Sequence, residues 1–449
     1  MDVDEIVAAG ATQQVAAMRS GALSSRDLTV ATLAAVEREN ARLNAVVELL
    51  ADLAFDAAAE ADRRRSSGDD GPLLGVPIAI KNDLDIEGHV TAYGTRANTK
   101  PATADAELIA RIRSAGMVPV ATTTLPELAI YGFTESEANG ITRNPHDLDH
   151  SPGGSSGGSA ALVGAGAVSA ATASDGAGSV RIPAASCGLV GFKPTHGAMP
   201  SSGGWHGMST QSGLAQRVAD VALYLQTLGT FDPDLVAAAS TEPAPLRIGV
   251  STSASAATRA LPLDPEVRAA LDVTASALDD AGHDVSEVSI PYKLDARMLV
   301  VRFLAGIRDM AASVDDQSHL EKRTRQVARL GRPFGPGSIA RARNAGARWG
   351  STVHDDLGVD ILLTPVMSGP ALPVGHFDGR GGIRTVLGMN SFYPYTAQWN
   401  HAGTPAVSMP VGRTDRGLPL AVQLIGQSGD DATLMSLAGW LERSRAGDR

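Results

Sequence analysis

Residues 153–195, GGSSGGSAALVGAGAVSAATASDGAGSVRIPAASCGLVGFKPT, carry most of the information about the fold and function of this chain. Two glycine-rich segments, 153–159 and 173–179, each contain serines, and the small apolar residues between them are expected to form a helix. Glycine allows backbone angles that other residues avoid and leaves amide N–H groups exposed. A linker of this composition would be flexible and would not continue directly into ordered elements. The arrangement therefore indicates a site rather than a tether.

The two segments do not match the familiar phosphate loops. The motif G-x-x-x-x-G-K-[ST] needs a lysine after the glycines and none is present, and G-x-G-x-x-G is also absent. Gly-Ala-Gly precedes Ser179, so consecutive backbone amides there are able to form an oxyanion hole. The elbow motif G-x-S-x-G is excluded, because Val180 and Arg181 follow Ser179. For residues 153–159 taken alone, a flexible turn remains the alternative.

Lys81 directly follows the apolar run LLGVPIAI at 73–80, which predicts a buried strand. Burial of an ammonium group is costly, and desolvation lowers the pKa of a lysine. A lysine at this place is therefore a candidate for a neutral base. The alternative is a purely structural lysine that pairs with Asp83 or Asp85.

The rest of the chain alternates predicted helices and strands, which favours an α/β architecture. Ser24 is a plausible helix cap. We predict two helices within 12–64, further helices at 103–116, 265–281 and 317–350, and strands at 117–123, 246–251, 283–290 and 359–364. We expect one domain over 1–449, with its core at about 70–230 and a helical, peripheral cap at 290–350.

Composition excludes several classes of function. Lys and Arg total 38 against 49 Asp and Glu, so the net charge of −11 disfavours nucleic acid as a ligand. No long, uniformly apolar segment predicts a membrane span, and the acidic N-terminus is not typical of a signal peptide. The one cysteine, Cys187, has small apolar neighbours and is expected to be an inert buried thiol in a reducing compartment. These features together predict a cytoplasmic protein. No HExxH motif is present, and we expect no metal or cofactor.

Taken together, Lys81, the loop at Ser155 and Ser179 resemble the amidase signature family in order and spacing. The signature G-G-S-S-G-G-S through G-x-x-G-x-K-P-T is present at 153–195, and the resemblance covers roughly residues 20–440. Further similar segments are GVPIAIKND (75–83), TRNP (142–145), AGTPAVSMPVG (402–412) and GLPLAVQLIG (417–426).

The resemblance implies a single large α/β domain with a mixed, twisted central sheet and helices on both sides. It also implies a Ser-Ser-Lys triad. Ser179 would attack the carbonyl, and Ser155, after a cis peptide bond, would relay protons between Ser179, neutral Lys81 and the leaving amine. The oxyanion would be held by the backbone amides of Gly176, Ala177, Gly178 and Ser179. The serines and their loop would be oriented by Ser156, Asp175 and Arg181.

One departure from the family lies in the second glycine segment. The family usually shows G-T-D-x-G-G-S, whereas residues 173–179 read ASDGAGS. Ala177 replaces a glycine, and Gly176 replaces a bulkier residue. The interpretation is that the conformational freedom of the loop has moved by one position, which predicts an oxyanion hole of slightly different shape.

Aromatic residues gather in regions that the family places beside its substrate cleft, above all in SFYPYTAQWN at 391–400. An apolar or aryl acyl group is therefore the expected part of the substrate, and core packing is the alternative for each aromatic. No acidic or basic residue obviously marks a pocket for a charged substrate. The expected substrate-binding residues are Tyr131, Phe133, Gly154, Trp205, Met208, Phe392, Tyr395 and Trp399.

The function that the resemblance implies is a broad-specificity amidohydrolase for linear aryl or alkyl amides, extending to esters and carbamates (urethanes) through an acyl-enzyme. A specialised carbamate or oligoamide hydrolase is the alternative. An amidotransferase component that forms glutaminyl-tRNA is disfavoured by the aromatic cluster, and a non-enzymatic binding protein by the intact triad. The expected partner is a small-molecule substrate, with no nucleic acid and no membrane, and the expected state is a monomer or homodimer.

Overall fold

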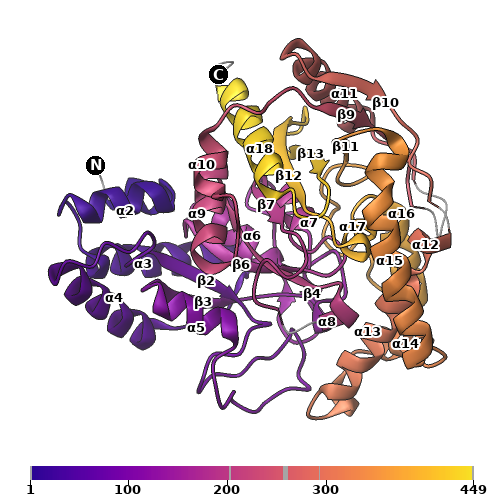
Figure 1. Cartoon of the computed structure of the whole chain (residues 1–449). Helices are drawn as coiled ribbons and strands as arrows, with labels where there is room; N and C mark the ends of the chain where they lie inside the picture. Colours follow the sequence, from indigo (N-terminus) through magenta and orange to yellow (C-terminus); the bar gives the residue numbers. More distant parts are fainter. Residues whose placement is uncertain (1–2, 202–203, 256–260, 293, 447–449) are drawn as a thin grey trace.

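An 11-stranded sheet runs through the computed structural model, which describes residues 3–201, 204–255, 261–292 and 294–446 (Figure 1). The strand order is β1-β3-β2-β6-β8-β7-β12-β13-β11-β9-β10, and the pairs are both parallel and antiparallel. The strands are β1 (Val46–Leu49), β2 (Pro77–Lys81), β3 (Val118–Thr123), β6 (Ala170–Asp175), β7 (Val190–Lys193), β8 (Thr210–Ala215), β9 (Arg247–Val250), β10 (Asp284–Glu287), β11 (Ile361–Pro365), β12 (Ala406–Arg413) and β13 (Pro419–Ile425). A two-stranded sheet pairs β4 (Glu135–Ser136) with β5 (Gly140–Ile141).

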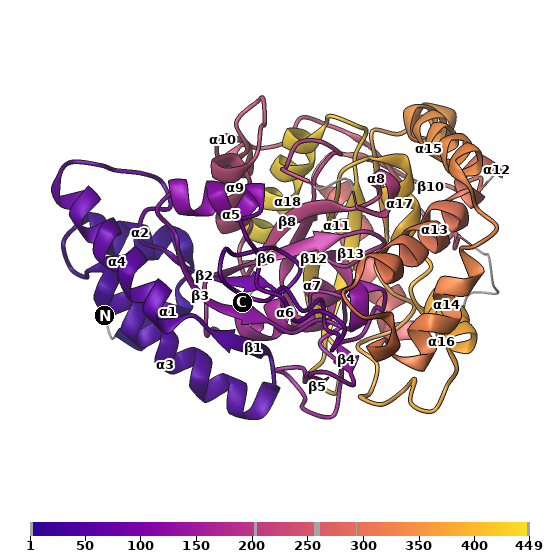
Figure 2. The ribbon, with the colours of Figure 1, turned by 90° about the horizontal axis from the view of Figure 1, so that it is seen from below.

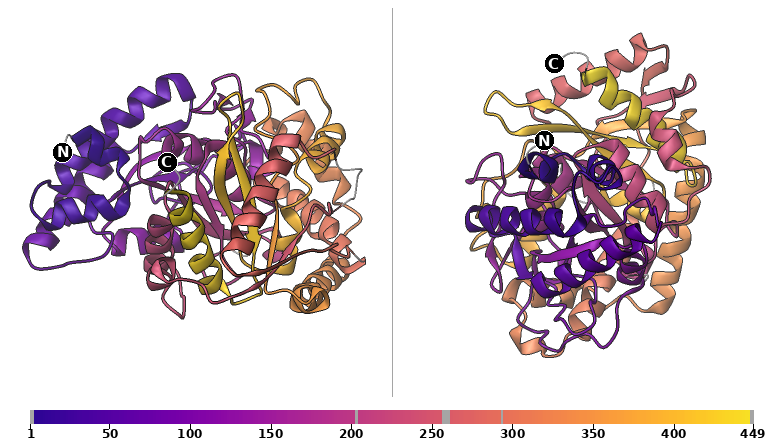
Figure 3. Two further views of the ribbon diagram at one scale, coloured as in Figure 1. Left: turned by 90° about the horizontal axis from the view of Figure 1, so that it is seen from above. Right: turned by 90° about the vertical axis from the view of Figure 1, so that its left-hand side faces the viewer.

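Helices cover both faces of the large sheet, as the views in Figures 2 and 3 show. They are α1 (Val3–Ala8), α2 (Ala11–Arg19), α3 (Ser25–Leu43), α4 (Ala51–Ser66), α5 (Glu107–Ser114), α6 (Gly157–Gly164), α7 (Arg181–Cys187), α8 (Gly204–Gly207), α9 (Val218–Leu228), α10 (Leu235–Ser240), α11 (Pro265–Asp280), α12 (Leu294–Arg297), α13 (Leu299–Ser313), α14 (Lys322–Leu330), α15 (Pro336–Leu357), α16 (Gly382–Phe392), α17 (Ala397–Ala402) and α18 (Asp431–Ala446). The predicted α/β fold with a mixed central sheet is confirmed. None of the described helices is long and apolar enough to cross a bilayer.

The N-terminal region differs from the prediction of two helices within 12–64. It contains three helices, α2 to α4, and the short strand β1 between the last two. Asn44 ends α3 with a left-handed φ of 50°, and Asn40 Oδ1 accepts hydrogen bonds from the amides of Ala45 and Val46 at 2.8 and 2.9 Å. The chain therefore leaves the helix in an extended conformation, and β1 pairs with β3. The predicted cap is confirmed, since the Ser24 side chain accepts a hydrogen bond from the amide of Asp27.

The buried strand predicted at 73–80 begins later than expected, because Gly75 adopts a positive φ of 82° in a preceding turn. The strand β2 continues through Lys81 and lies parallel to β3 and β6. Ala79 of β2 is in register with Ala171 of β6, so the C-terminal ends of both strands meet at one edge of the sheet. The residues that follow these two strands are therefore brought together.

The C-terminal helices surround that edge of the sheet. The predicted helical region 290–350 contains α12, α13, α14 and part of α15, which lie at the right-hand side of Figure 1, far from the N-terminal helices. The contacts between α13 and α14, and between α14 and α16, join them into one layer.

Candidate active site

Lys81 is fully buried at the end of β2, where it meets two serines. Its Nζ lies 2.9 Å from Ser155 Oγ, 2.7 Å from Ser174 Oγ and 3.2 Å from Asp83 Oδ2. Burial lowers the pKa of Lys81 from its ordinary value, against the opposing effect of the Asp83 carboxylate. The contact with Asp83 is the structural alternative that the sequence left open, and it coexists with the contact to Ser155.

Ser174 is a site residue that the sequence did not single out. Its hydroxyl donates to Asp83 Oδ2 at 2.5 Å and accepts from Lys81 Nζ, so it connects the Asp83 carboxylate to the Lys81 side chain. In the sequence, the one indication of this role was its position directly before Asp175. The structure adds that both residues lie at the end of β6, which runs parallel to β2.

Ser155 and Ser179 line one cavity of about 470 Å³. Ser155 is almost completely buried, whereas Ser179 is partly exposed. The amide of Ser156 donates to the Ser179 carbonyl at 3.4 Å, which joins the two glycine loops, and the Gly154–Ser155 peptide bond is cis. Gly154 lies outside the cavity wall, and a Cβ there would lie 2.6 Å from the Phe133 nitrogen. Glycine at this position therefore allows the Ser155 loop to pack against a neighbouring loop.

Asp175 organises the loop that contains Ser179. Its carboxylate accepts from the backbone amides of Gly178 at 2.6 Å and Val180 at 3.1 Å, and from Arg181 Nε and Nη2 at 3.0 Å each. Asp175 and Arg181 are both fully buried. Burial alone would raise the pKa of Asp175, but the Arg181 guanidinium outweighs it and holds that pKa well below its usual range. The loop is thus built around a buried ion pair.

Two residues from the C-terminal part of the chain complete this ion pair, and the sequence prediction missed both. Arg181 Nη2 donates to Asn400 Oδ1 and Nη1 donates to Gln423 Oε1, each at 2.6 Å. Asn400 Nδ2 donates in turn to Asp175 Oδ1 at 2.9 Å. Gln423 is the one polar residue of the otherwise apolar strand β13, which is the signal that was available.

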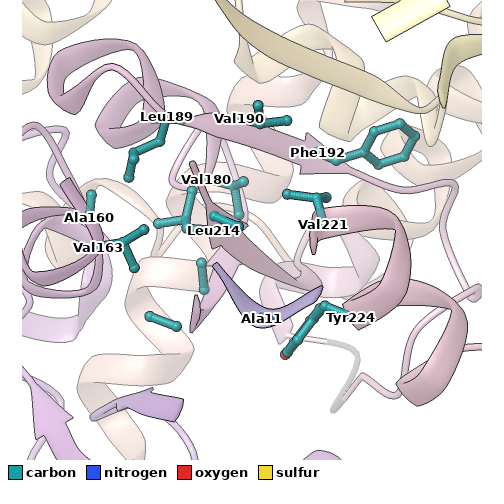
Figure 4. Packing of buried hydrophobic residues seen from close by; sticks show 14 of the residues in the cluster. Ala11, Ala160, Val163, Val180, Leu189, Val190, Phe192, Leu214, Val221 and Tyr224 are labelled. Carbon is teal, nitrogen blue, oxygen red and sulfur yellow. The ribbon is translucent and has the colours of Figure 1, made fainter. Parts of the chain in front are cut away.

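Val180, directly after Ser179, packs into the hydrophobic core and so holds the loop in place. It is fully buried in the main hydrophobic cluster, where Figure 4 shows it beside Leu214. The loop is therefore held by an apolar side chain and an ion pair.

The four predicted oxyanion-hole amides are not equivalent. The amide of Gly178 points to Asp175 and is occupied by its carboxylate. Within the described residues, the amides of Gly176, Ala177 and Ser179 have no acceptor, and all three residues line the cavity. Three free N–H groups at one wall are suited to a developing negative charge.

The expected shift of conformational freedom within this loop is not observed. Gly178 has the positive φ, at 120°, whereas Gly176 does not, so the left-handed position stays where the family has a glycine. A Cβ at Gly178 would lie 2.4 Å from Thr396 Oγ1, but one at Gly176 would meet only the Trp205 ring at an ordinary 3.6 Å. Ala177 is therefore accommodated without backbone strain.

The predicted substrate-binding residues divide into two groups. Tyr131 and Trp205 line the cavity, and Tyr393 is the aromatic of the 392–399 cluster that joins them. The remaining predicted residues lie outside its wall, namely Phe133, Gly154, Met208, Phe392, Tyr395 and Trp399. The helix α16 ends at Phe392, so helical spacing does not carry on through the cluster and its side chains point in different directions.

Two of the aromatic residues outside the cavity wall, Trp399 and Phe133, pack in the hydrophobic core. Trp399 is fully buried and stacks on Trp349, with ring centroids 5.3 Å apart, and its Nε1 donates to the Tyr395 carbonyl. Phe133 stacks between Tyr131 and Phe377 at 5.3 and 4.8 Å. The core alternative for Trp399 and Phe133 is the one that the contacts support.

Truncation of Trp399 is therefore expected to weaken the fold. The variant Trp399→Ala should lower the free energy of unfolding by about 3 kcal/mol, because a fully buried aromatic leaves a cavity. Urea denaturation measures this loss. Trp205→Ala is the matched control, since the partly exposed Trp205 should cost less than half as much. Unchanged stability of Trp399→Ala would contradict the placement.

Most of the remaining cavity wall is apolar and comes from helices far along the sequence. It includes Val300, Phe303 and Leu304 of α13, Leu330 of α14, and Ile383, Val386, Leu387 and Met389 of α16. Sequence reasoning did not identify these residues, because each lies in an ordinary amphipathic helix. Over the described ranges, no group of three or more His, Cys, Asp or Glu side chains is placed to hold a metal ion.

Comparisons with known proteins agree with the geometry. A model of the amidase family matches residues 27–435. A Mycobacterium tuberculosis protein assigned as amidase AmiB2 is 40% identical over 463 residues, covering 99% of this chain and 98% of that protein. One component of the glutamyl-tRNA(Gln) amidotransferase of Desulforapulum autotrophicum is 31% identical, covering 99% of this chain and 98% of that protein.

Solved structures extend the likeness to three dimensions. The structure of 6-aminohexanoate cyclic dimer hydrolase superposes with a TM-score of 0.86 at 28% identity, covering 99% of this chain and 97% of that chain. The resemblance inferred from the sequence motifs is confirmed. The chain belongs to the amidase signature family and is a hydrolase that acts on amide C–N bonds.

Proposed function

We propose that this chain is a serine hydrolase that cleaves linear amides bearing an apolar or aryl group, through an acyl-enzyme on Ser179. The observation that supports this most directly is the contact between Lys81 Nζ and Ser155 Oγ at 2.9 Å, beside a cavity that Ser179 also lines. A buried lysine with a lowered pKa is suited to accept a proton.

The proposed reaction begins when Ser179 Oγ attacks the carbonyl carbon. Its proton passes to Ser155 while the proton of Ser155 passes to neutral Lys81 Nζ. The carbonyl oxygen becomes an oxyanion, which the free amides of Gly176, Ala177 and Ser179 bind. Collapse breaks the C–N bond, and a proton returns from Lys81 through Ser155 to the leaving nitrogen. Water then attacks the acyl-enzyme by the same route, which releases the acid and restores Ser179.

The buried ion pair has a positioning role in this scheme. Asp175 and Arg181 fix the loop so that its remaining amides face the cavity. The Ser156 amide ties the Ser155 loop to Ser179. A change in either contact would misplace the nucleophile rather than remove it.

The apolar wall favours an apolar acyl or amine group over a polar one. Esters and carbamates undergo the same acyl transfer, so activity on both is part of the proposal. A specialised carbamate or oligoamide hydrolase is the second candidate, and the likeness to 6-aminohexanoate cyclic dimer hydrolase favours the oligoamide form. The apolar wall offers little to the polar side chain of glutamine, which disfavours the amidotransferase role.

A substrate comparison tests the proposal. We expect kcat/KM for an anilide to exceed that for acetamide or glutamine by about 10- to 100-fold, because burying a phenyl ring contributes about 1.5–3 kcal/mol. Phe303→Ala should reduce this preference while acetamide turnover survives, since Phe303 lines the cavity. Phe55→Ala, on the distant helix α4, is the matched control. Glutamine hydrolysed as well as the anilide would contradict the proposal.

A further inference from the structure

Arg297 is the single charged residue among the described residues that line the cavity. No carboxylate is found in the described part of that wall. The chain carries more acidic than basic residues, 49 against 38, so a site whose one charge is positive runs against the overall composition. The sequence alone had indicated no residue for a charged substrate.

Among the residues that the structure describes, Arg297 also has no partner. It is exposed at the end of α12, and within the described ranges no hydrogen bond or ion pair engages its guanidinium. Asp295, the carboxylate nearest to it in sequence, pairs instead with Arg348 at 3.1 Å. The guanidinium therefore remains available to a ligand.

Arg297 and the two serines of the proposed reaction, Ser155 and Ser179, line the same cavity, and most of its other lining residues are apolar. Leu330, Ile383 and Leu387 line the cavity and are also 37%, 49% and 46% exposed, so the cavity opens to solvent between α14 and α16. The exposed Arg297 belongs to the same wall. In Figure 1 its helix α12 lies at the outer edge of the molecule, whereas α7, which follows Ser179, lies near the centre. The two ends of the cavity thus differ in chemistry.

We propose that the substrates of this enzyme carry a carboxylate at the end remote from the scissile amide, with an apolar segment between the two. The apolar segment would lie along α13, α14 and α16, and the carboxylate would pair with Arg297. A guanidinium binds a carboxylate through two parallel hydrogen bonds, which fixes the orientation of the bound group. This inference rests on the proposed function at Ser179, and it names the class of amide that the site selects.

The test compares two series of substrates with the same leaving group. The first is the mono-4-nitroanilides of linear dicarboxylic acids, which keep one free carboxylate, and the second is the 4-nitroanilides of monocarboxylic acids of equal length. We expect the wild-type enzyme to favour the carboxylate series by up to about fivefold in kcat/KM, the upper range for an ion pair with an exposed arginine. Arg297→Ala should lower kcat/KM for the carboxylate series more than for the neutral series, so that the preference disappears, and Arg297→Glu should reverse the preference. Higher salt should weaken the preference.

Arg384→Ala is the matched control, because Arg384 is an exposed arginine on α16 outside the cavity wall. It should keep the wild-type preference. Equal losses on both series in Arg297→Ala, or a wild-type preference for the neutral series, would overturn the inference.

A binding experiment separates this inference from the proposed function. Calorimetry with the Ser179→Ala variant measures the Kd of a carboxylated and a neutral anilide without turnover. Tighter binding of the carboxylated anilide that disappears when Arg297→Ala is added would support recognition even if no anilide is hydrolysed. Equal Kd values for the two ligands would overturn the inference, whatever the activity.

Discussion

Replacement of Ser179 by alanine is expected to lower kcat on amides by about four orders of magnitude or more while the fold remains intact. The hydroxyl is the group that becomes acylated in the proposed reaction, so its loss removes the nucleophile. Ser179 is partly exposed and lies in a loop held by Asp175 and Val180, so its truncation should leave the melting temperature unchanged. Steady-state kinetics with circular dichroism measure both effects.

Ser209→Ala is the control for this variant, because Ser209 lines the same cavity without a place in the proposed reaction. It should retain most of the activity. If Ser179→Ala kept more than about one hundredth of wild-type kcat, the nucleophile would be another group.

Replacement of Lys81 by methionine is expected to lower amide turnover by about three orders of magnitude and ester turnover by much less. Methionine keeps most of the buried aliphatic volume but cannot pass a proton to the leaving group. An amine leaving group needs that proton, whereas an alkoxide needs it less. Matched amide and ester substrates measure the difference, and equal losses on both would remove Lys81 from leaving-group protonation.

Lys193→Met is the matched control, since Lys193 is the other lysine that is fully buried among the described residues. Its Nζ donates to the Pro194 carbonyl at 2.9 Å, and it does not line the cavity. The ratio of amide to ester activity should therefore stay at the wild-type value.

The dependence of the rate on pH follows from the same lysine. Below its pKa, Lys81 is protonated and cannot accept the proton of Ser155, so kcat should rise with pH and reach an alkaline plateau. Because burial lowers the pKa of Lys81, the rise should come below the ordinary range of lysine. Burial also lowers the pKa of Lys193 to about 7, so Lys193 is a second lysine whose titration could produce a rise of kcat with pH. The rise of kcat with pH should remain in Lys193→Met and disappear in Lys81→Met.

Much of the site follows from local sequence. The sequence indicates Lys81 because burial of an ammonium group at the end of a strand is costly and points to a function. It indicates Ser155 and Ser179 because glycines flank both serines. The α/β class followed from alternating apolar runs. These features depend on neighbours in the chain, and they are visible without the fold.

Other features depend on contacts between distant segments. Asn400 and Gln423 reach the ion pair only because β13 and α17 lie beside the loop in space. The directions of Tyr393 and Trp399 depend on where α16 ends, and the cavity wall depends on how α13, α14 and α16 pack. Arg297 was not singled out for the same reason.

The ion pair of Asp175 and Arg181 also has a consequence for synthesis on the ribosome. Arg181 finds its partners Asn400 and Gln423 only 219 and 242 residues further along the chain. At typical translation speeds of about 5–20 residues per second, the wait for Gln423 lasts roughly 10–50 s. Until then the guanidinium can pair with Asp175 but lacks two of the acceptors that its buried position requires. We therefore expect the loop that contains Ser179 to reach its final arrangement only near the end of translation. A chain released early would contain Lys81, Ser155 and Ser179 without this arrangement.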